Sequence, residues 1–192
     1  MEKLLLILDI DETLIHARTE ELSGLKYDFK VFNFYVYKRP YLDHFLSFVF
    51  ENYHVAFWSS ASDDYVEEII QKLLNDNQKP KFIWGNKRCT PMSVDLINEF
   101  GYYNHTSNHY VYTKCLKKVK KYGYRLERTL IVDDTPAKVV KNYGNAIYID
   151  EFTGSTTDTM LNYLKDYLKE LEVIQNVREI EKRWWKHKFL LT

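Results

Sequence analysis

Two aspartates that stand two residues apart follow an apolar run near the start of this 192-residue sequence. Residues 4–10 are apolar except for Asp9, and Asp11 comes directly after them, with Thr13 two residues further on. In a strand, residues two apart lie on the same face, so the two carboxylates would point to the same place. One carboxylate can then act as a nucleophile while the other carries a proton. The alternative is that both aspartates are ordinary turn or cap residues.

Polar side chains also follow two later apolar runs. Residues 55–58 precede Ser59, and residues 129–132 precede Asp133 and Asp134. In an open parallel sheet, ligands bind at the carboxyl ends of the strands. If these runs are neighbouring strands, four carboxylates and a hydroxyl group meet at one point. Such a cluster needs a cation, and Mg²⁺ is the natural one because it prefers oxygen ligands.

The elements that must position these side chains alternate along the sequence. Apolar runs predict strands at residues 4–10, 55–58, 129–132 and 146–149. Helical spacing and start signals predict helices after Pro40, after Ser62, over 114–122, from Thr135 and over 157–183. An aromatic and β-branched run at 29–37 predicts a hairpin-like excursion after the first strand. Strands that alternate with helices imply an α/β fold with a mainly parallel sheet.

The length of the chain suits one domain with a sizeable core. We predict a single domain over residues 1–192, and we see no internal repeat or Pro- and Ser-rich linker that would divide it. Residues 75–113 have a less regular pattern, so we expect a small insertion at about 76–113. A C-terminal helical tail is predicted at about 157–192, where the pair Trp184-Trp185 should pack the tail onto the domain.

The composition bears on the binding partners and the cellular location of the protein. The 27 Lys and Arg residues balance 27 Asp and Glu residues, so net charge favours neither nucleic acid nor a membrane surface. No stretch approaches the ~20 apolar residues of a membrane span, and the first apolar run is too short for a signal peptide. Cys89 and Cys115 form no CxxC pair, which argues against a disulfide framework. We expect a cytoplasmic protein without a membrane partner, or a nuclear one if the organism is eukaryotic.

Four segments together resemble the motifs of the haloacid dehalogenase superfamily phosphatases. They are Leu6-Ile7-Leu8-Asp9-Ile10-Asp11-Glu12-Thr13-Leu14, Phe57-Trp58-Ser59-Ser60-Ala61-Ser62, Lys114, and Leu130-Ile131-Val132-Asp133-Asp134-Thr135-Pro136. The closer resemblance is to the RNA polymerase II carboxy-terminal-domain small phosphatases and the NLI-interacting-factor-like proteins. That resemblance rests on Lys38-Arg39-Pro40, on Tyr65 six residues after Ser59, and on Asn145-Ala146-Ile147. It covers nearly the whole chain and implies a Rossmann-like sheet with a hairpin flap after the first strand.

The resemblance also implies roles for single residues. The expected catalytic residues are Asp9 as nucleophile, Asp11 as acid and base, Ser59 and Lys114. The expected substrate-binding residues are Thr13, Ser59, Ser60 and Lys114. Mg²⁺ would be held by Asp9, Asp11 through its backbone carbonyl, Asp134, and Asp133 through water. Lys117 is the alternative to Lys114, because the span from Lys114 to Asp133 is a few residues longer than the family pattern.

The expected function is a Mg²⁺-dependent phosphomonoester hydrolase that forms an aspartyl-phosphate and acts on phosphorylated Ser or Thr of proteins. One alternative is a phosphatase of nucleic-acid ends or of a small metabolite, and another is a scaffold that has kept the fold without catalysis. A lysine-rich run over residues 117–121 would suit a polynucleotide, yet the neutral net charge favours a solvated helix face. The sequence assigns no oligomeric state.

Overall fold

The computed structural model describes residues 2–95, 110–142 and 144–190. Within these residues, five parallel strands form a central sheet in the order β10-β9-β1-β5-β6. The strands are β1 (Leu5–Leu8), β5 (His54–Trp58), β6 (Ile83–Trp84), β9 (Thr129–Asp133) and β10 (Ala146–Tyr148). β1 lies in the middle, with Leu6 between Val55 of β5 and Leu130 of β9. The mainly parallel α/β sheet predicted from the sequence is therefore confirmed.

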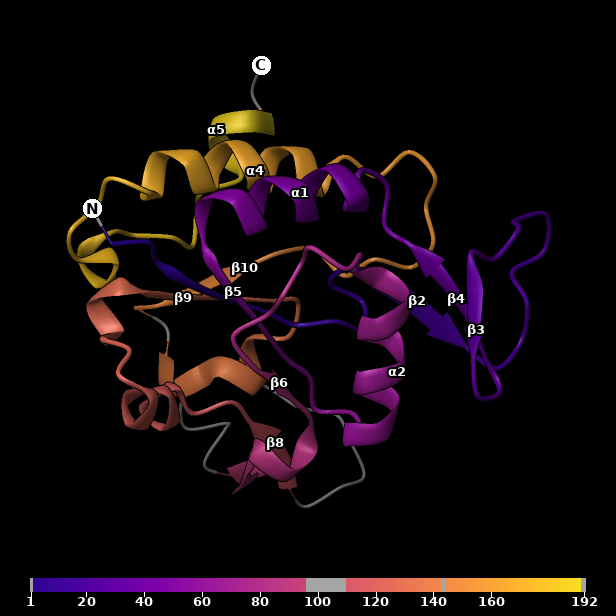
Figure 1. Ribbon diagram of the computed structural model, residues 1–192, viewed down its shortest axis with the longest axis horizontal. Helices are drawn as coiled ribbons and strands as arrows, with labels where there is room; N and C mark the ends of the chain where they lie inside the picture. Colours follow the sequence, from indigo (N-terminus) through magenta and orange to yellow (C-terminus); the bar gives the residue numbers. More distant parts are fainter. Residues whose placement is uncertain (1, 96–109, 143, 191–192) are drawn as a thin grey trace.

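Both faces of the sheet are covered, because alternate residues of β1 point to opposite sides. Leu6 and Leu8 pack in one core with α1 (Leu42–Asn52), α2 (Asp63–Leu73) and α4 (Met160–Leu171). Leu5 and Ile7 pack in a second core on the other face. Figure 1 shows α1 and α4 side by side above the sheet. The second face is covered by the 3-10 helices η2 (Leu116–Tyr122) and η4 (Pro136–Asn142), where the sequence predicted ordinary helices.

A small antiparallel sheet follows the first strand and stands to the right in Figure 1. It consists of β2 (Ile15–Arg18), β3 (Phe29–Val31) and β4 (Phe34–Lys38), in the order β2-β4-β3. The β3–β4 turn carries Phe32 in a left-handed conformation (φ 52°) with its ring largely exposed. The hairpin predicted over residues 29–37 is present, and β2 adds a strand that the sequence did not predict. We call this sheet the flap.

The predicted insertion at 76–113 divides into two parts in the structure. Residues 83–84 form β6, which pairs with β5 and belongs to the main sheet. After a short 3-10 helix η1 (Asn86–Arg88), β7 (Thr90–Ser93) pairs antiparallel with β8 (Tyr110–Thr113). The part of the insertion at 96–109 lies outside the described residues. β8 matters for the site because it leads directly into Lys114.

The C-terminal segment is less helical than its leucine spacing suggests. α4 ends at Leu171, so the prediction of one helix over 157–183 is wrong. Among the residues described after α4, only η5 (Val177–Glu179) and α5 (His187–Leu190) are helical. One more short 3-10 helix, η3 (Leu126–Arg128), lies earlier in the chain, directly before β9. Trp185 is buried and stacks on Tyr167 with ring centroids 5.2 Å apart, whereas Trp184 is exposed. Across the described residues, no helix is long and apolar enough to cross a membrane.

Candidate active site

Asp9 lies at the carboxyl end of β1, where the sequence predicted a nucleophile. Its backbone N–H donates to the carbonyl of Val132 (3.0 Å), which keeps it beside the end of β9. Its side chain is only 1% exposed. Burial alone would raise the pKa of Asp9, but the ammonium groups of Lys114 and Lys138 outweigh burial and hold this pKa below its usual value. Asp9 is therefore a buried carboxylate in its charged form.

Lys114 is the lysine that meets this carboxylate. Its Nζ lies 2.6 Å from Asp9 Oδ1 and 2.6 Å from Asp133 Oδ2, and its side chain is fully buried. Lys117, the alternative from the sequence, is exposed on η2. The geometry therefore places Lys114, and not Lys117, in the cluster.

The two aspartates at the end of β9 complete an oxygen-rich group. Asp133 Oδ1 accepts from the backbone N–H of Thr135 (2.9 Å), and Asp134 accepts from the hydroxyl groups of Thr13 (3.1 Å) and Thr135 (2.8 Å). Burial, and secondarily the nearby Asp9, raise the pKa of Asp133 to about 6 even though Lys114 opposes the shift. Carboxylates crowded in this way are stabilised by a cation.

This acidic group fits one divalent cation. Asp9, Asp133 and Asp134 each offer one carboxylate oxygen, and the three oxygens lie within 4.8 Å of one another. A donor set made only of oxygens suits Mg²⁺ rather than a metal that prefers nitrogen or sulfur. The residues predicted as carboxylate ligands thus occupy one place in the structure, with Asp11 next to them in the chain.

Asp11 has different neighbours and a different charge balance. Its Oδ1 accepts from the hydroxyl group of Tyr65 (2.6 Å), and its Oδ2 accepts from the hydroxyl group of Ser59 (3.1 Å). Burial raises the pKa of Asp11, the two hydrogen bonds work against that shift, and the Asp9 carboxylate adds to it. The environment therefore moves the pKa values of Asp9 and Asp11 in opposite directions.

Ser59 ends β5 and lies inside the cluster, whereas Ser60 does not. The Ser59 side chain is 1% exposed, and its Oγ accepts from the backbone N–H of Ala61 (3.0 Å) while donating to Asp11. Ser60 is half-buried, and among the described contacts it has no hydrogen bond to the other predicted site residues. Of the two serines, the structure brings only Ser59 to the carboxylates.

Arg39 fixes the loop that carries the first two aspartates. Its Nε and Nη2 donate to the two oxygens of Asp158 (2.9 and 2.8 Å), and Nη2 also donates to the carbonyl of Asp150 (2.9 Å). Its Nη1 donates to the carbonyl of Thr13 (3.0 Å). The side chain is fully buried. One guanidinium therefore joins the loop after β1 to the segment before α4.

Three side chains that contact or support the cluster were not predicted as site residues. Tyr65 and Arg39 were noticed only as points of family resemblance. Lys138 carried no signal, because it lies two residues after Pro136 and its direction depends on how η4 packs. Its Nζ lies 3.8 Å from Asp9 Oδ2.

Comparison with known proteins assigns the chain to a family. The sequence model of the NLI interacting factor-like phosphatase family matches residues 4–178. The chain belongs to this family. The resemblance inferred from the motifs is thereby confirmed, and the matched region includes every residue named in the cluster.

Two relatives match most of the chain. It is 25% identical over 183 residues to nuclear envelope morphology protein 1 of Schizosaccharomyces pombe, and 23% identical over 185 residues to human carboxy-terminal domain RNA polymerase II polypeptide A small phosphatase 1. These matches cover 91% and 93% of this chain but only 34% and 63% of the relatives. The chain thus spans less than two thirds of either relative's length.

A solved structure shares the fold. The fission yeast RNA polymerase II CTD phosphatase Fcp1 superposes with a TM-score of 0.51 at 17% identity, over 92% of this chain and 53% of that one. At this identity the likeness concerns the arrangement of the elements. It agrees with the Rossmann-like fold expected for the family.

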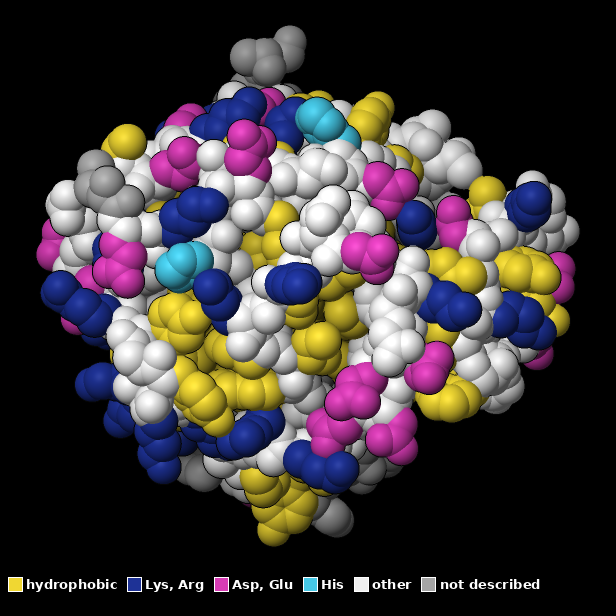
Figure 2. Space-filling view, viewed as in Figure 1, with side chains coloured by type: hydrophobic (Ala, Val, Ile, Leu, Met, Phe, Trp, Pro, Cys, Tyr) yellow, Lys and Arg dark blue, Asp and Glu magenta, His cyan; other side chains and the backbone are white. Residues whose placement is uncertain are grey.

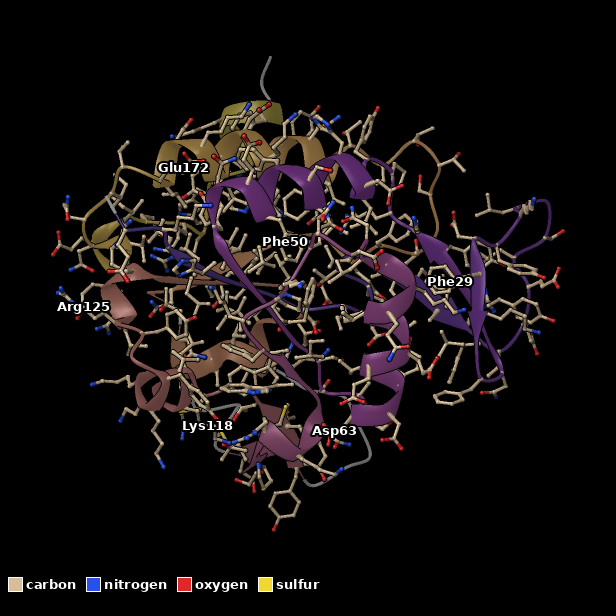
Figure 3. All side chains as sticks on the ribbon, viewed as in Figure 1. Phe29, Phe50, Asp63, Lys118, Arg125 and Glu172 are labelled. Carbon is tan, nitrogen blue, oxygen red and sulfur yellow. The ribbon has the colours of Figure 1, made fainter. Side chains whose placement is uncertain are left out.

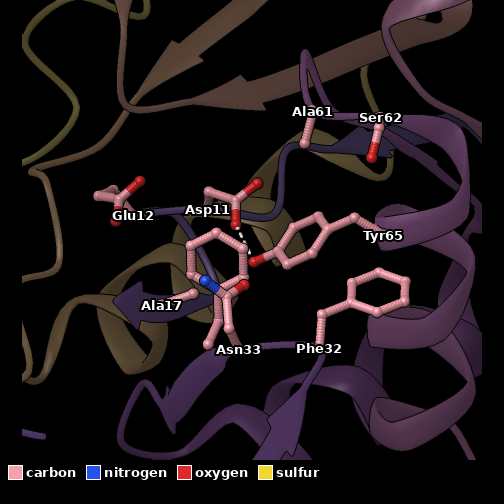
Figure 4. A pocket seen from close by; sticks show the side chains of 9 residues that line it. Asp11, Glu12, Ala17, Phe32, Asn33, Ala61, Ser62 and Tyr65 are labelled. Atoms are coloured by element: carbon pink, nitrogen blue, oxygen red, sulfur yellow. Dashed lines mark hydrogen bonds between the residues drawn. The ribbon is translucent and has the colours of Figure 1, made fainter. Parts of the chain in front are cut away.

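An open pocket lies beside Asp11, between the flap and the start of α2. Its volume is about 540 Å³. The close-up in Figure 4 shows Asp11 and Tyr65 joined by their hydrogen bond, with Phe32 and Asn33 of the flap turn below them. The remaining lining residues are Glu12, Ala17, Phe34, Ala61 and Ser62. Asp11 thus faces a pocket whose wall is largely aromatic and aliphatic.

The lysine-rich run lies elsewhere, on η2. Figure 2 shows Lys and Arg side chains gathered at the lower left of the molecule, where Figure 3 labels Lys118. Lys117, Lys120 and Lys121 are exposed there. Lys118 instead donates to the carbonyls of Arg88 (2.5 Å) and Cys89 (3.3 Å), which ties η2 to η1. The run has the character of a solvated helix face with one structural lysine.

Proposed function

We propose that this chain is a Mg²⁺-dependent phosphomonoester hydrolase that forms a phosphoryl-aspartate on Asp9. The observation that carries the proposal is that Lys114 Nζ lies 2.6 Å from Asp9 Oδ1, whereas Asp11, two residues later, accepts hydrogen bonds from Tyr65 and Ser59. Asp9 is held charged by two lysines, and burial favours the protonated form of Asp11. Pairs of titratable groups whose environments push their pKa values apart are the mark of a nucleophile and its acid partner.

In the first step, an oxygen of Asp9 attacks phosphorus, and the bond between phosphorus and the leaving oxygen breaks. Asp11, which the hydrogen bonds from Tyr65 and Ser59 position before the reaction, gives its proton to that leaving oxygen. The transition state is loose, so positioning and neutralisation of charge supply most of the catalysis. Lys114, bound to Asp9, neutralises charge on the phosphoryl group, and Ser59 turns its single O–H from Asp11 to one of the phosphoryl oxygens.

In the second step, Asp11 takes a proton from a water molecule, and this water attacks phosphorus. The bond between Asp9 and phosphorus breaks, so that both aspartates return to their starting states. Asp9, Asp134 and the backbone carbonyl of Asp11, with Asp133 acting through water, would hold Mg²⁺, whose charge would offset that of the phosphoryl group. Thr13 keeps Asp134 in place through its hydroxyl group.

For the substrate class we propose phosphorylated Ser or Thr in a protein. The pocket beside Asp11 is open and has an aromatic wall from Phe32 and Phe34, which suits the side chain of a neighbouring residue in a peptide. The human relative is named a phosphatase of the RNA polymerase II carboxy-terminal domain, which is a protein substrate. The location remains a prediction, cytoplasmic or nuclear. The fission yeast relative is named for nuclear envelope morphology, which favours a nuclear setting.

The decisive experiment compares wild type with Asp9→Asn on an aryl phosphate, with Mg²⁺ and after removal of metal by EDTA. We expect Asp9→Asn to lower kcat by about 1,000-fold or more, EDTA to abolish activity, and added Mg²⁺ to restore it. The matched control is Asp76→Asn, a change at an exposed aspartate outside the cluster. Equal activity of Asp9→Asn and wild type would refute the proposal. A panel of phosphoserine peptides, 3′- and 5′-phosphorylated oligonucleotides and sugar phosphates then tests the substrate class, and a preference for oligonucleotides would overturn it.

A further inference from the structure

Lys138 is placed at the cluster by the backbone of η4. Its N–H donates to the carbonyl of Thr135 (3.0 Å), the residue directly after Asp133 and Asp134. Its own carbonyl accepts from the backbone N–H of Lys114 (2.7 Å). The two lysines are thus joined through their main chains, and their side chains reach the two oxygens of one carboxylate, that of Asp9.

The two lysines differ in how fully they are engaged. Lys114 is fully buried, and its Nζ lies 2.6 Å from both Asp9 and Asp133. The Lys138 side chain is 23% exposed, and its Nζ is 3.8 Å from Asp9 Oδ2, which is too long for a hydrogen bond. No shorter contact of this Nζ is found among the described residues. An ammonium group carries three N–H donors, so Lys138 has donors to offer to a ligand.

Lys138 also changes the charge of the site. Its side chain is a cation at neutral pH, as lysine ordinarily is, and it faces the Asp9 carboxylate. Three carboxylates against two lysines leave one net negative charge, which one divalent cation turns into one net positive charge. Without Lys138 the same set would be neutral and would attract a phosphate dianion less strongly.

We propose that Lys138 is a second phosphate-binding lysine, whose ammonium group donates to a non-bridging oxygen of the phosphoryl group when substrate reaches Asp9. The inference rests on the proposed function. A lysine that only balanced carboxylates would be expected to be as buried and as closely paired as Lys114. Lys138 is instead partly open to solvent and loosely held, so it can leave Asp9 Oδ2 for a phosphate oxygen at little cost.

The test compares Lys138→Met and Lys138→Arg with wild type and with Lys141→Met, which removes an exposed lysine from the same 3-10 helix. Two quantities are measured at saturating Mg²⁺: kcat/KM for an aryl phosphate, and the inhibition constant of inorganic phosphate. Because Lys138 is partly exposed, we expect Lys138→Met to lower kcat/KM by about 10- to 100-fold, less than the ~100- to 1,000-fold of a fully buried donor. The inhibition constant should rise about 10-fold, Lys138→Arg should recover most of both losses, and Lys141→Met should stay within about twofold of wild type.

Unchanged kcat/KM and phosphate inhibition in Lys138→Met, with Asp9→Asn inactive, would overturn the role of Lys138 and leave the proposed function standing. Activity of Asp9→Asn equal to wild type would overturn the proposed function itself. If Lys138→Met lowers only the Mg²⁺ concentration needed for half activity, the lysine acts on the carboxylates alone and the inference is wrong. Thermal unfolding of each variant is recorded, and Lys138→Gln replaces Lys138→Met if the latter does not fold.

Discussion

The ion pair between Arg39 and Asp158 should dominate the stability of the loop that carries Asp9 and Asp11. Replacing Arg39 with Met removes two hydrogen bonds to one carboxylate and two to the carbonyls of Thr13 and Asp150. The Arg39 side chain is fully buried and that of Asp158 is 16% exposed, so the remaining carboxylate is left with little solvent. Breaking a buried pair in this way costs about 3–5 kcal/mol, a large part of the ~5–15 kcal/mol of a typical domain.

A neighbouring ion pair provides the control. Lys38 Nζ lies 2.8 Å from Asp43 Oδ1, the same distance as Arg39 Nη2 from Asp158 Oδ2, but Asp43 is 76% exposed. Lys38→Met should therefore cost only about 0–1 kcal/mol. Urea unfolding of both variants gives the free energy of unfolding, provided that the m-value stays unchanged. For a chain of this size, Arg39→Met should lower Tm by roughly 6–20 °C.

The double variant Arg39→Met/Asp158→Asn tests the pairwise character of the effect. At the start of α4, the backbone N–H of Met160 donates to Asp158 Oδ1 (2.9 Å). Asparagine at position 158 keeps an oxygen that can accept this hydrogen bond. We expect the double variant to lose about 1–3 kcal/mol less than the sum of the two single variants. A loss for Arg39→Met within ~1 kcal/mol of that for Lys38→Met would refute the reasoning that burial decides the energy of these pairs.

Two further outcomes follow from the site. Tyr65→Phe removes the 2.6 Å hydrogen bond to Asp11 but keeps the ring, so kcat for an aryl phosphate should fall about 10-fold with the free energy of unfolding lowered by only about 1 kcal/mol; an unchanged kcat would show that this bond does not position the acid. Lys114→Met should lower kcat by more than about 100-fold, whereas Lys117→Met should stay within about twofold of wild type. Steady-state kinetics on both lysine variants, with circular dichroism to verify folding, would contradict the assignment if Lys117→Met were the inactive one.

The sequence predicted which edge of the sheet carries the acidic cluster, because the information there is local. Each long apolar run ends in a polar residue, and the parallel arrangement brings these ends together, so Asp9, Ser59 and Asp133 could be expected to meet. β6 escaped prediction because a strand of two residues, Ile83–Trp84, gives no periodic pattern. It is recognised only by its pairing with β5.

Two other features were not predicted from the sequence, the end of α4 and the position of Lys138. The apolar spacing continues past Leu171 to Ile174, yet α4 ends at Leu171. The β-branched residues Val173 and Ile174 favour helix less. Asn176 then caps the next 3-10 helix by accepting from the N–H of Arg178. The position of Lys138 could not be predicted, because it depends on how η4 packs. Lys138 and Lys141 both follow Pro136, and nothing in the sequence tells which of the two side chains points inward.

The central position of β1 has a consequence for how the chain folds during its synthesis. Leu5 pairs with His54 on one side and with Thr129 on the other, so one edge of β1 can close early while the other waits for a strand made much later. Pairing between such distant segments is slow, because the intervening chain must first be closed into a loop. Until β9 arrives, a nascent chain presents an apolar, unpaired strand edge, which invites association with other chains. The ribosome-bound intermediate of this fold should therefore depend on protection by chaperones until β9 has emerged.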